Sequence, residues 1–72
     1  MFDVILIKVT DVKEMDELSN GQTVIDCWQD GDKFCLHVER ETSSGDLNYE
    51  TISYPLSAFI RVRVYEQENE EI

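Results

Sequence analysis

The sequence has few basic residues. It contains six Lys and Arg against 16 Asp and Glu, which gives a formal net charge of −10 with the one His neutral. Affinity for a phosphate backbone comes from Lys and Arg side chains that release counterions. The charge therefore argues against direct binding to nucleic acid, and against binding to an anionic membrane surface. It favours basic partners, with which association is fast and sensitive to salt.

Long apolar runs and cysteine pairs are also lacking. No stretch approaches the ~18 apolar residues that a membrane span requires. Met1 is followed by Phe-Asp, without the basic segment that begins a signal peptide. Cys27 and Cys35 are too few for a disulfide scaffold and fit a compartment that keeps thiols reduced. The sequence predicts a cytoplasmic protein.

The length of 72 residues supports one domain. We expect residues 1–65 to form a single small β domain and residues 66–72 to form an acidic tail that frays. A chain this short buries only about 60% of the surface of its unfolded form, which leaves no room for a large enclosed substrate cavity. The sequence is therefore not expected to be an enzyme, although a fold alone never excludes a site.

Apolar and β-branched residues predict five strands. Short apolar runs and period-2 alternation indicate strands rather than helices, at residues 2–9, 22–29, 33–40, 47–54 and 59–65. Between the first two strands, Asp11 and Glu14 have the spacing of a capping box. Val12, Met15 and Leu18 recur there at about helical spacing. A short helix or helical loop that ends at Gly21 is predicted.

Asp30-Gly31 predicts a two-residue turn between the second and third strands. A two-residue loop at this position places Cys27 opposite Phe34. This register is preferred because a slip by one residue would turn every side chain to the other face. It also places the side chains of one face toward the core: Ile25, Cys27, Phe34, Leu36 and Val38. Trp28, Cys35 and His37 lie on the other face, so the two cysteines point apart and a disulfide is disfavoured.

The fold class is mainly β, as a small five-stranded antiparallel barrel or curled sheet. A strand, a long connection, three hairpin-linked strands and a last strand follow one another, and this order resembles that of an SH3-like barrel. The resemblance is one of architecture only. The aromatic peptide-binding motif of SH3 domains is absent, so their proline-rich ligands are not implied. An open sheet crossed by one helix is the competing arrangement.

Residues capable of chemistry are few. Cys35 and His37 share a strand face, which permits a nucleophile and its base, but acidic surroundings do little to form a thiolate. A structural zinc site needs four ligands, and Cys27 is expected to face the core. Asp30 and Asp32 lack the loop length and the terminal Glu of a calcium-binding hand. No metal or cofactor is therefore expected.

The leading hypothesis is a non-enzymatic module that binds a basic surface of a partner protein. The net charge exceeds the magnitude of about 2–8 that suits a small soluble domain, which favours a use for it. In a sharper form, the carboxylates replace phosphates in a nucleic-acid-binding groove, as in small acidic inhibitors carried by phages and mobile elements. The candidate partner-binding residues are Asp11, Glu14, Asp16, Glu17, Trp28, Asp30, Asp32, Glu66, Glu68, Glu70 and Glu71.

A second hypothesis is a structural or assembly subunit. An exposed strand edge, with the Trp28, Phe59 and Tyr65 side chains, would then form an interface for self-association. Most such interfaces have two-fold symmetry. The sequence leaves open whether the protein is a monomer or a homodimer.

Overall fold

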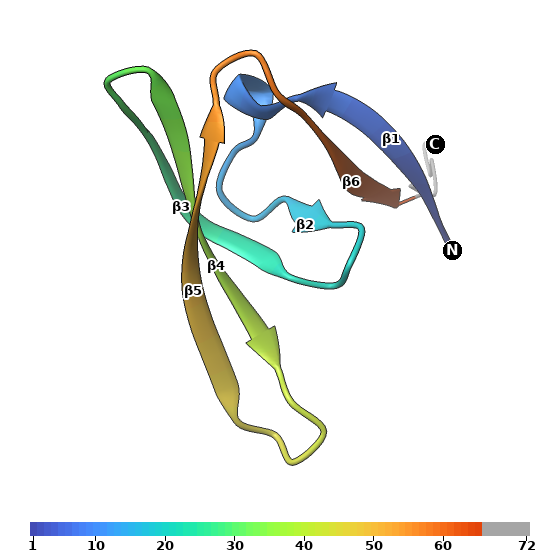
Figure 1. The fold of residues 1–72 in the computed structure, drawn as a ribbon. Coiled ribbons are helices and arrows are strands. Elements are labelled where there is room, and N and C mark those ends of the chain that lie inside the picture. The colour runs from blue at the N-terminus through green and yellow to red at the C-terminus, as the bar shows by residue number, and fades with distance from the viewer. Residues whose placement is uncertain (66–72) are drawn as a thin grey trace, which may run out of the picture.

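The computed structural model describes residues 1–65, which form one open antiparallel sheet. The strands follow the order β1-β6-β2-β3-β4-β5, so β1 and β5 are the two edges (Figure 1). The mainly β antiparallel class is confirmed, but the sheet has six strands and does not close into a barrel. The elements are β1 (Phe2–Lys8), the 3₁₀ helix η1 (Val9–Asp11), β2 (Glu17–Leu18), β3 (Thr23–Asp30), β4 (Lys33–Glu41), β5 (Leu47–Pro55) and β6 (Phe59–Tyr65).

Two consecutive hairpins join β3, β4 and β5. The first turn is Gly31-Asp32, one residue later than expected, and Gly31 has a φ of 62° that suits glycine. Cys27 therefore lies opposite Leu36 rather than Phe34. The shift of the pairing is two residues, so the side chains of β4, and those of β3 from Asp26 onward, keep their predicted faces.

A bulge between Val24 and Asp26 changes which residue of β3 reaches the core. Val24 lies opposite Val38 and is fully buried, whereas Ile25, which was predicted to be in the core, is only half-buried. A bulge adds one residue to a strand without a partner, so alternation alone cannot locate it.

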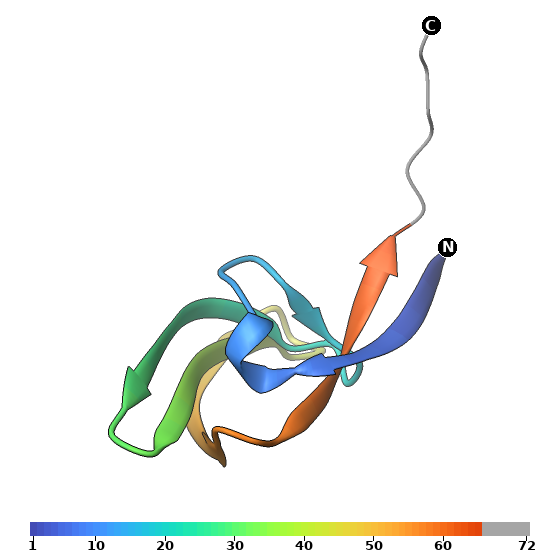
Figure 2. The same cartoon turned by 90° about the horizontal axis from the view of Figure 1, so that it is seen from above.

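Strand β6 pairs with β1 along its full length, and the predicted bounds of residues 59–65 are confirmed. Ile60 and Val62 lie opposite Ile7 and Ile5 on the face that meets the core. Viewed from above, β1 and β6 project from the curled β3–β4–β5 part of the sheet (Figure 2).

The prediction of a short helix or helical loop over residues 11–21 is wrong. η1 ends at Asp11, and the chain then runs beside β3, where Met15 N–H donates to the Val24 carbonyl and Val24 N–H to the Asp16 carbonyl. Met15 has a φ of 78°, in the left-handed region, which no right-handed helix can include. Met15 is consequently exposed, while the other members of the expected helical stripe, Val12 and Leu18, are buried. Gly21 does adopt a positive φ.

The core gathers side chains from η1, β2, β3, β4 and β6, and from Val12 after η1. Its buried members are Val9, Val12, Leu18, Val24, Leu36, Val38 and Val62. All are aliphatic, and four of them sit on β2, β3 and β4. The sheet therefore curls over a core that lies close to β3 and β4, and that leaves much of the β1–β6 pair uncovered.

Candidate functional site

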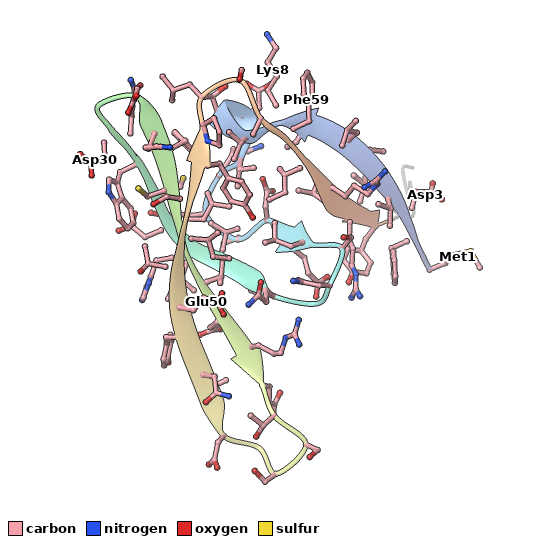
Figure 3. The ribbon with its side chains drawn as sticks, in the orientation of Figure 1. Met1, Asp3, Lys8, Asp30, Glu50 and Phe59 are labelled. Carbon is pink, nitrogen blue, oxygen red and sulfur yellow. The ribbon has the colours of Figure 1, made fainter. Side chains whose placement is uncertain are left out.

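The charges of the described residues are unevenly placed. Strand β1 carries one Asp and one Lys, and β6 carries two Arg, so these strands together have a charge of +2. We call β1 and β6 the apolar arm. Residues 9–58, here called the acidic half, hold eleven carboxylates and three cations, a charge of −8. Figure 3 shows Asp30, in the acidic half, on the side of the molecule away from Asp3 of the arm.

Most carboxylates in the acidic half have no cation beside them. Within residues 1–65 there is one ion pair, in which Arg63 Nη1 lies 3.7 Å from Glu17 Oε2. The other carboxylates of this part of the chain remain free to attract positive charge from outside.

An aromatic and acidic surface covers the outer face of β3, β4 and β5, the face opposite the core. Register places Trp28 beside Cys35, Asp26 beside His37, and Glu39 beside Tyr49. We call this set the outer face: Asp26, Trp28, His37, Glu39 and Tyr49. Trp28 and Tyr49 are 40% and 54% exposed, so their rings are open to a ligand.

Contacts within the sheet hold the rings of the outer face. The rings of His37 and Tyr49 stack at 5.9 Å with 12° between their planes. His37 Nδ1 lies 2.9 Å from Thr51 Oγ1, which fixes the imidazole orientation. Guanidinium groups stack on aromatic faces and bind carboxylates with two parallel hydrogen bonds. Rings flanked by the carboxylates of Asp26 and Glu39 therefore suit arginine side chains.

A second acidic group surrounds Cys27. The Cys27 thiol lies 3.4 Å from the Val12 carbonyl, where residues 12–16 run beside β3. Burial raises the pKa of this thiol, and the carboxylates of Asp26, Glu14 and Asp16 raise the pKa further. Negative potential thus accumulates where residues 12–16 meet β3.

The predicted partner-binding residues are separated into several places. Glu14, Asp16 and Asp26 all act on the Cys27 thiol, and Asp16 also accepts a hydrogen bond from Lys13 N–H at 2.9 Å. Asp30 and Asp32 lie at the β3–β4 turn, and Asp11 is exposed at the end of η1. The four tail residues Glu66, Glu68, Glu70 and Glu71 fall outside the described residues.

Glu17 differs from the other predicted residues because it faces the apolar arm. It is half-buried on β2, pairs with Arg63 and accepts a hydrogen bond from the Tyr65 hydroxyl. Its charge is therefore used inside the molecule, which makes it a poor contact for a partner.

The two thiols lie on opposite faces, as expected, and within residues 1–65 neither forms a hydrogen bond with His37. Cys35 is buried, and its sulfur lies 3.5 Å from Ser53 Oγ, while His37 bonds to Thr51. Both cysteines are free. Among residues 1–65, no group of three His, Cys, Asp or Glu side chains has an arrangement that could hold a metal ion.

The apolar arm is the second surface that stands out, because it exposes many large hydrophobic side chains. Of twelve exposed large hydrophobic residues in the described chain, eight are Met1 or belong to β1 or β6. On the arm's outer face, the Phe2 ring meets Tyr65 edge to face at 5.5 Å and lies under the Arg63 guanidinium at 4.4 Å. Exposed apolar patches of this kind mark sites of protein interaction.

Sequence reasoning missed Asp26, Glu39, His37 and Tyr49 as members of one surface. Their pairing could have been found by extending the hairpin register from β3–β4 to β4–β5, because residues opposite one another share a face. Comparison of the chain with protein families, curated proteins and solved structures finds no match. None of the helices in residues 1–65 has the length and apolar character needed to cross a membrane.

Proposed function

We propose that this protein is a non-enzymatic acidic module that binds a basic surface of a partner protein. The observation that carries the proposal is the outer face, where exposed aromatic rings lie beside carboxylates that have no cation of their own. Charge alone would attract any cation, whereas the rings add a preference for arginine, whose flat guanidinium stacks on them.

In the sharper form of the proposal, the partner is a nucleic-acid-binding protein and the carboxylates take the place of phosphates. The spread of the acids supports this form, since Glu14, Asp16, Asp26, Asp30 and Asp32 lie along residues 12–16, β3 and its turn. The carboxylates would neutralise the positive charge of a partner's groove over the length of this surface.

Two free thiols support a cytoplasmic location. The pairing of β1 with β6, the first and last strands, supports the proposed SH3-like order of strands.

The test is binding of an arginine-rich peptide, measured by calorimetry at two ionic strengths. We expect the affinity to fall at least tenfold between about 0.01 M and 0.15 M salt, because the Debye length shrinks from about 30 Å to 8 Å. An affinity that does not change with salt contradicts the electrostatic proposal.

A pair of charge-matched variants tests the place of binding. Asp26→Asn with Glu39→Gln removes two charges from the outer face, and Asp3→Asn with Asp46→Asn removes two charges elsewhere. The first pair should weaken peptide binding more than the second, although both have the same net charge. Equal losses would mean that the peptide senses overall charge and that the outer face has no special role.

A second function, of a different class, is favoured by the apolar arm. The protein would be a structural or assembly subunit that associates with itself through the edge strand β1 and the aromatic side chains Phe59 and Tyr65, which are 57% and 48% exposed. Trp28 was expected in this interface, but it lies in the acidic half. Sedimentation at micromolar concentration tests the function, and a strict monomer argues against it.

A further inference from the structure

Strand β1 has an open edge and apolar residues on both faces. Its one partner within residues 1–65 is β6, so the opposite edge presents backbone groups that pair with nothing in the described chain. Phe2, Val4, Ile5 and Leu6 are all at least 40% exposed. A long apolar edge is a template for another strand unless charge, proline or a bulge protects it. In β1 the charged residues are Asp3 and Lys8, near the two ends.

The backbone groups on the open edge can be assigned. Val9 N–H donates to the Ala58 carbonyl and continues the β1–β6 register, in which Lys8 lies opposite Phe59 (Figure 3). Because N–H groups alternate between the two sides of a strand, the odd-numbered residues face β6. The N–H and C=O groups of the even-numbered residues, Phe2, Val4, Leu6 and Lys8, therefore point to the open edge.

We propose that β1 pairs antiparallel with β1 of a second copy, about a two-fold axis at Ile5. This inference rests on the assembly function proposed above and gives it a geometry. Two antiparallel strands related by a two-fold axis keep the same face of the sheet on the same side, so each residue must meet one of equal parity. Centring on Ile5 uses the whole of β1 and joins two six-strand sheets into one.

The residues that meet in this register are compatible. Val4 lies opposite Leu6 of the second copy, and Ile5 lies opposite itself. Phe2 lies opposite Lys8, whose aliphatic stem can cover the ring while its ammonium stays in water. Asp3 lies opposite Ile7, so no like charges face each other. The outer faces of the two arms then form one continuous surface.

The placement of charge is compatible with a second copy at this edge. The arm has a charge of +2 and the acidic half −8, so pairing of the arms keeps the two acidic halves at opposite ends of the joined sheet. The arginines of β6 would lie three strand spacings apart, about 14 Å. That exceeds the Debye length of about 8 Å at physiological salt, so their repulsion is screened.

Pairing of β1 with the other edge, β5, is less suitable. Strand β5 carries four polar side chains, Asn48, Glu50, Thr51 and Ser53, along its length, so an apolar strand beside it would meet polar neighbours. Pro55 lacks an N–H to donate. Such head-to-tail pairing would also continue without closing and would give fibres rather than dimers.

Disulfide trapping tests the register, with sedimentation of the wild-type chain run alongside. Ile5→Cys places two thiols at a pair without backbone hydrogen bonds, with a Cα separation of about 4.5 Å, within the range of about 4.4–6.8 Å for disulfides. Val4→Cys is the matched control, because its two thiols would be offset by two residues along the strand and cannot bridge. The wild-type chain, which keeps Cys27 and Cys35, gives the background of cross-linking.

The proposal expects a dimer in sedimentation, rapid cross-linking of Ile5→Cys and little of Val4→Cys. Val4→Pro removes an N–H from the open edge without removing a bond to β6, and should weaken dimerisation about tenfold or more while urea unfolding of the monomer stays the same. A dimer that Val4→Pro leaves intact, without cross-linking at Ile5, overturns the β1 pairing but keeps the assembly function. A strict monomer overturns both, and long polymers overturn the two-fold axis.

Discussion

The acidic half and the apolar arm bury their residues to different extents. Six of the seven buried core residues belong to the acidic half, and Val62 is the one from the arm. The acidic half is thus folded against its own core and leaves its charges exposed, whereas the arm exposes much of its apolar area. One sheet therefore carries exposed negative charge in one region and exposed apolar area in the other.

The largest difference should appear when the same residue is truncated in both regions. Leu36 in β4 is fully buried and Leu6 in β1 is 57% exposed. Leu36→Ala should lower the free energy of unfolding by about 2–5 kcal/mol, because it leaves a cavity. Leu6→Ala should change it by less than about 0.5 kcal/mol in the monomer. Urea unfolding at low protein concentration measures both, and equal losses would contradict the difference in burial.

If Leu36→Ala fails to fold, Val38→Ala and Val4→Ala repeat the comparison with smaller side chains. Val38 is fully buried opposite Val24, and Val4 is 45% exposed. The order of the two losses must be the same as for the leucines.

Alkaline pH should weaken the acidic half. Burial, and then Asp26, Glu14 and Asp16, raise the pKa of the Cys27 thiol, so the folded state holds this proton more tightly than the unfolded state. The resulting stabilisation is complete below the pKa of the unfolded thiol and is lost as pH rises through the higher pKa of the folded state. As pH rises through this window, the free energy of unfolding of wild type should fall relative to that of Cys27→Ala. Below the window the two proteins should show the same dependence on pH. A Cys27→Ala curve parallel to wild type at all pH values would contradict the assignment.

The ion pair between the two regions should have a smaller effect. Glu17→Gln removes the pair that joins β2 to Arg63 of the arm, with both side chains about a quarter exposed. Solvent screening limits the loss to about 0.2–1 kcal/mol in thermal unfolding at low salt. Asp32→Asn, at an exposed turn, is the control and should cost less or even stabilise the chain. A larger loss for Asp32→Asn would show that Glu17 does not link the regions.

The least effect is expected on the rate of Cys27 alkylation. Glu14→Gln should lower the thiol pKa and speed the reaction modestly at neutral pH, because the carboxylate is a smaller cause of the raised pKa than burial. Glu17→Gln serves as the comparison, since Glu17 is paired with Arg63. Equal rates in wild type and Glu14→Gln would remove Glu14 from the acidic group around Cys27.

The strands could be predicted because alternation is a local property. In β6, Ile60, Val62 and Val64 alternate with Arg61 and Arg63, and the strand has the predicted bounds. The turn was predicted one residue early, yet the faces of β4 and of residues 26–30 were right, since the pairing there changed by an even number of residues.

The rest depends on contacts between distant residues. Residues 12–18 have the spacing of a helix, but Met15 and Leu18 bond to Val24 and Gln22, which the local pattern does not include. Glu17 resembled its acidic neighbours in sequence, and its pairing with Arg63 required the position of β6. The outer face likewise required the β4–β5 register, which brings His37 to Tyr49.

Trp28 gives the most direct test of the central claim, that the outer face is where basic partners bind. It is the one tryptophan of the chain and is 40% exposed on that face, so its fluorescence reports on this surface alone. During titration with an arginine-rich peptide at low salt, its emission should change in step with binding measured by calorimetry, and salt should weaken both signals together. Binding that leaves Trp28 emission unchanged, and that Asp26→Asn with Glu39→Gln does not weaken, would contradict the claim.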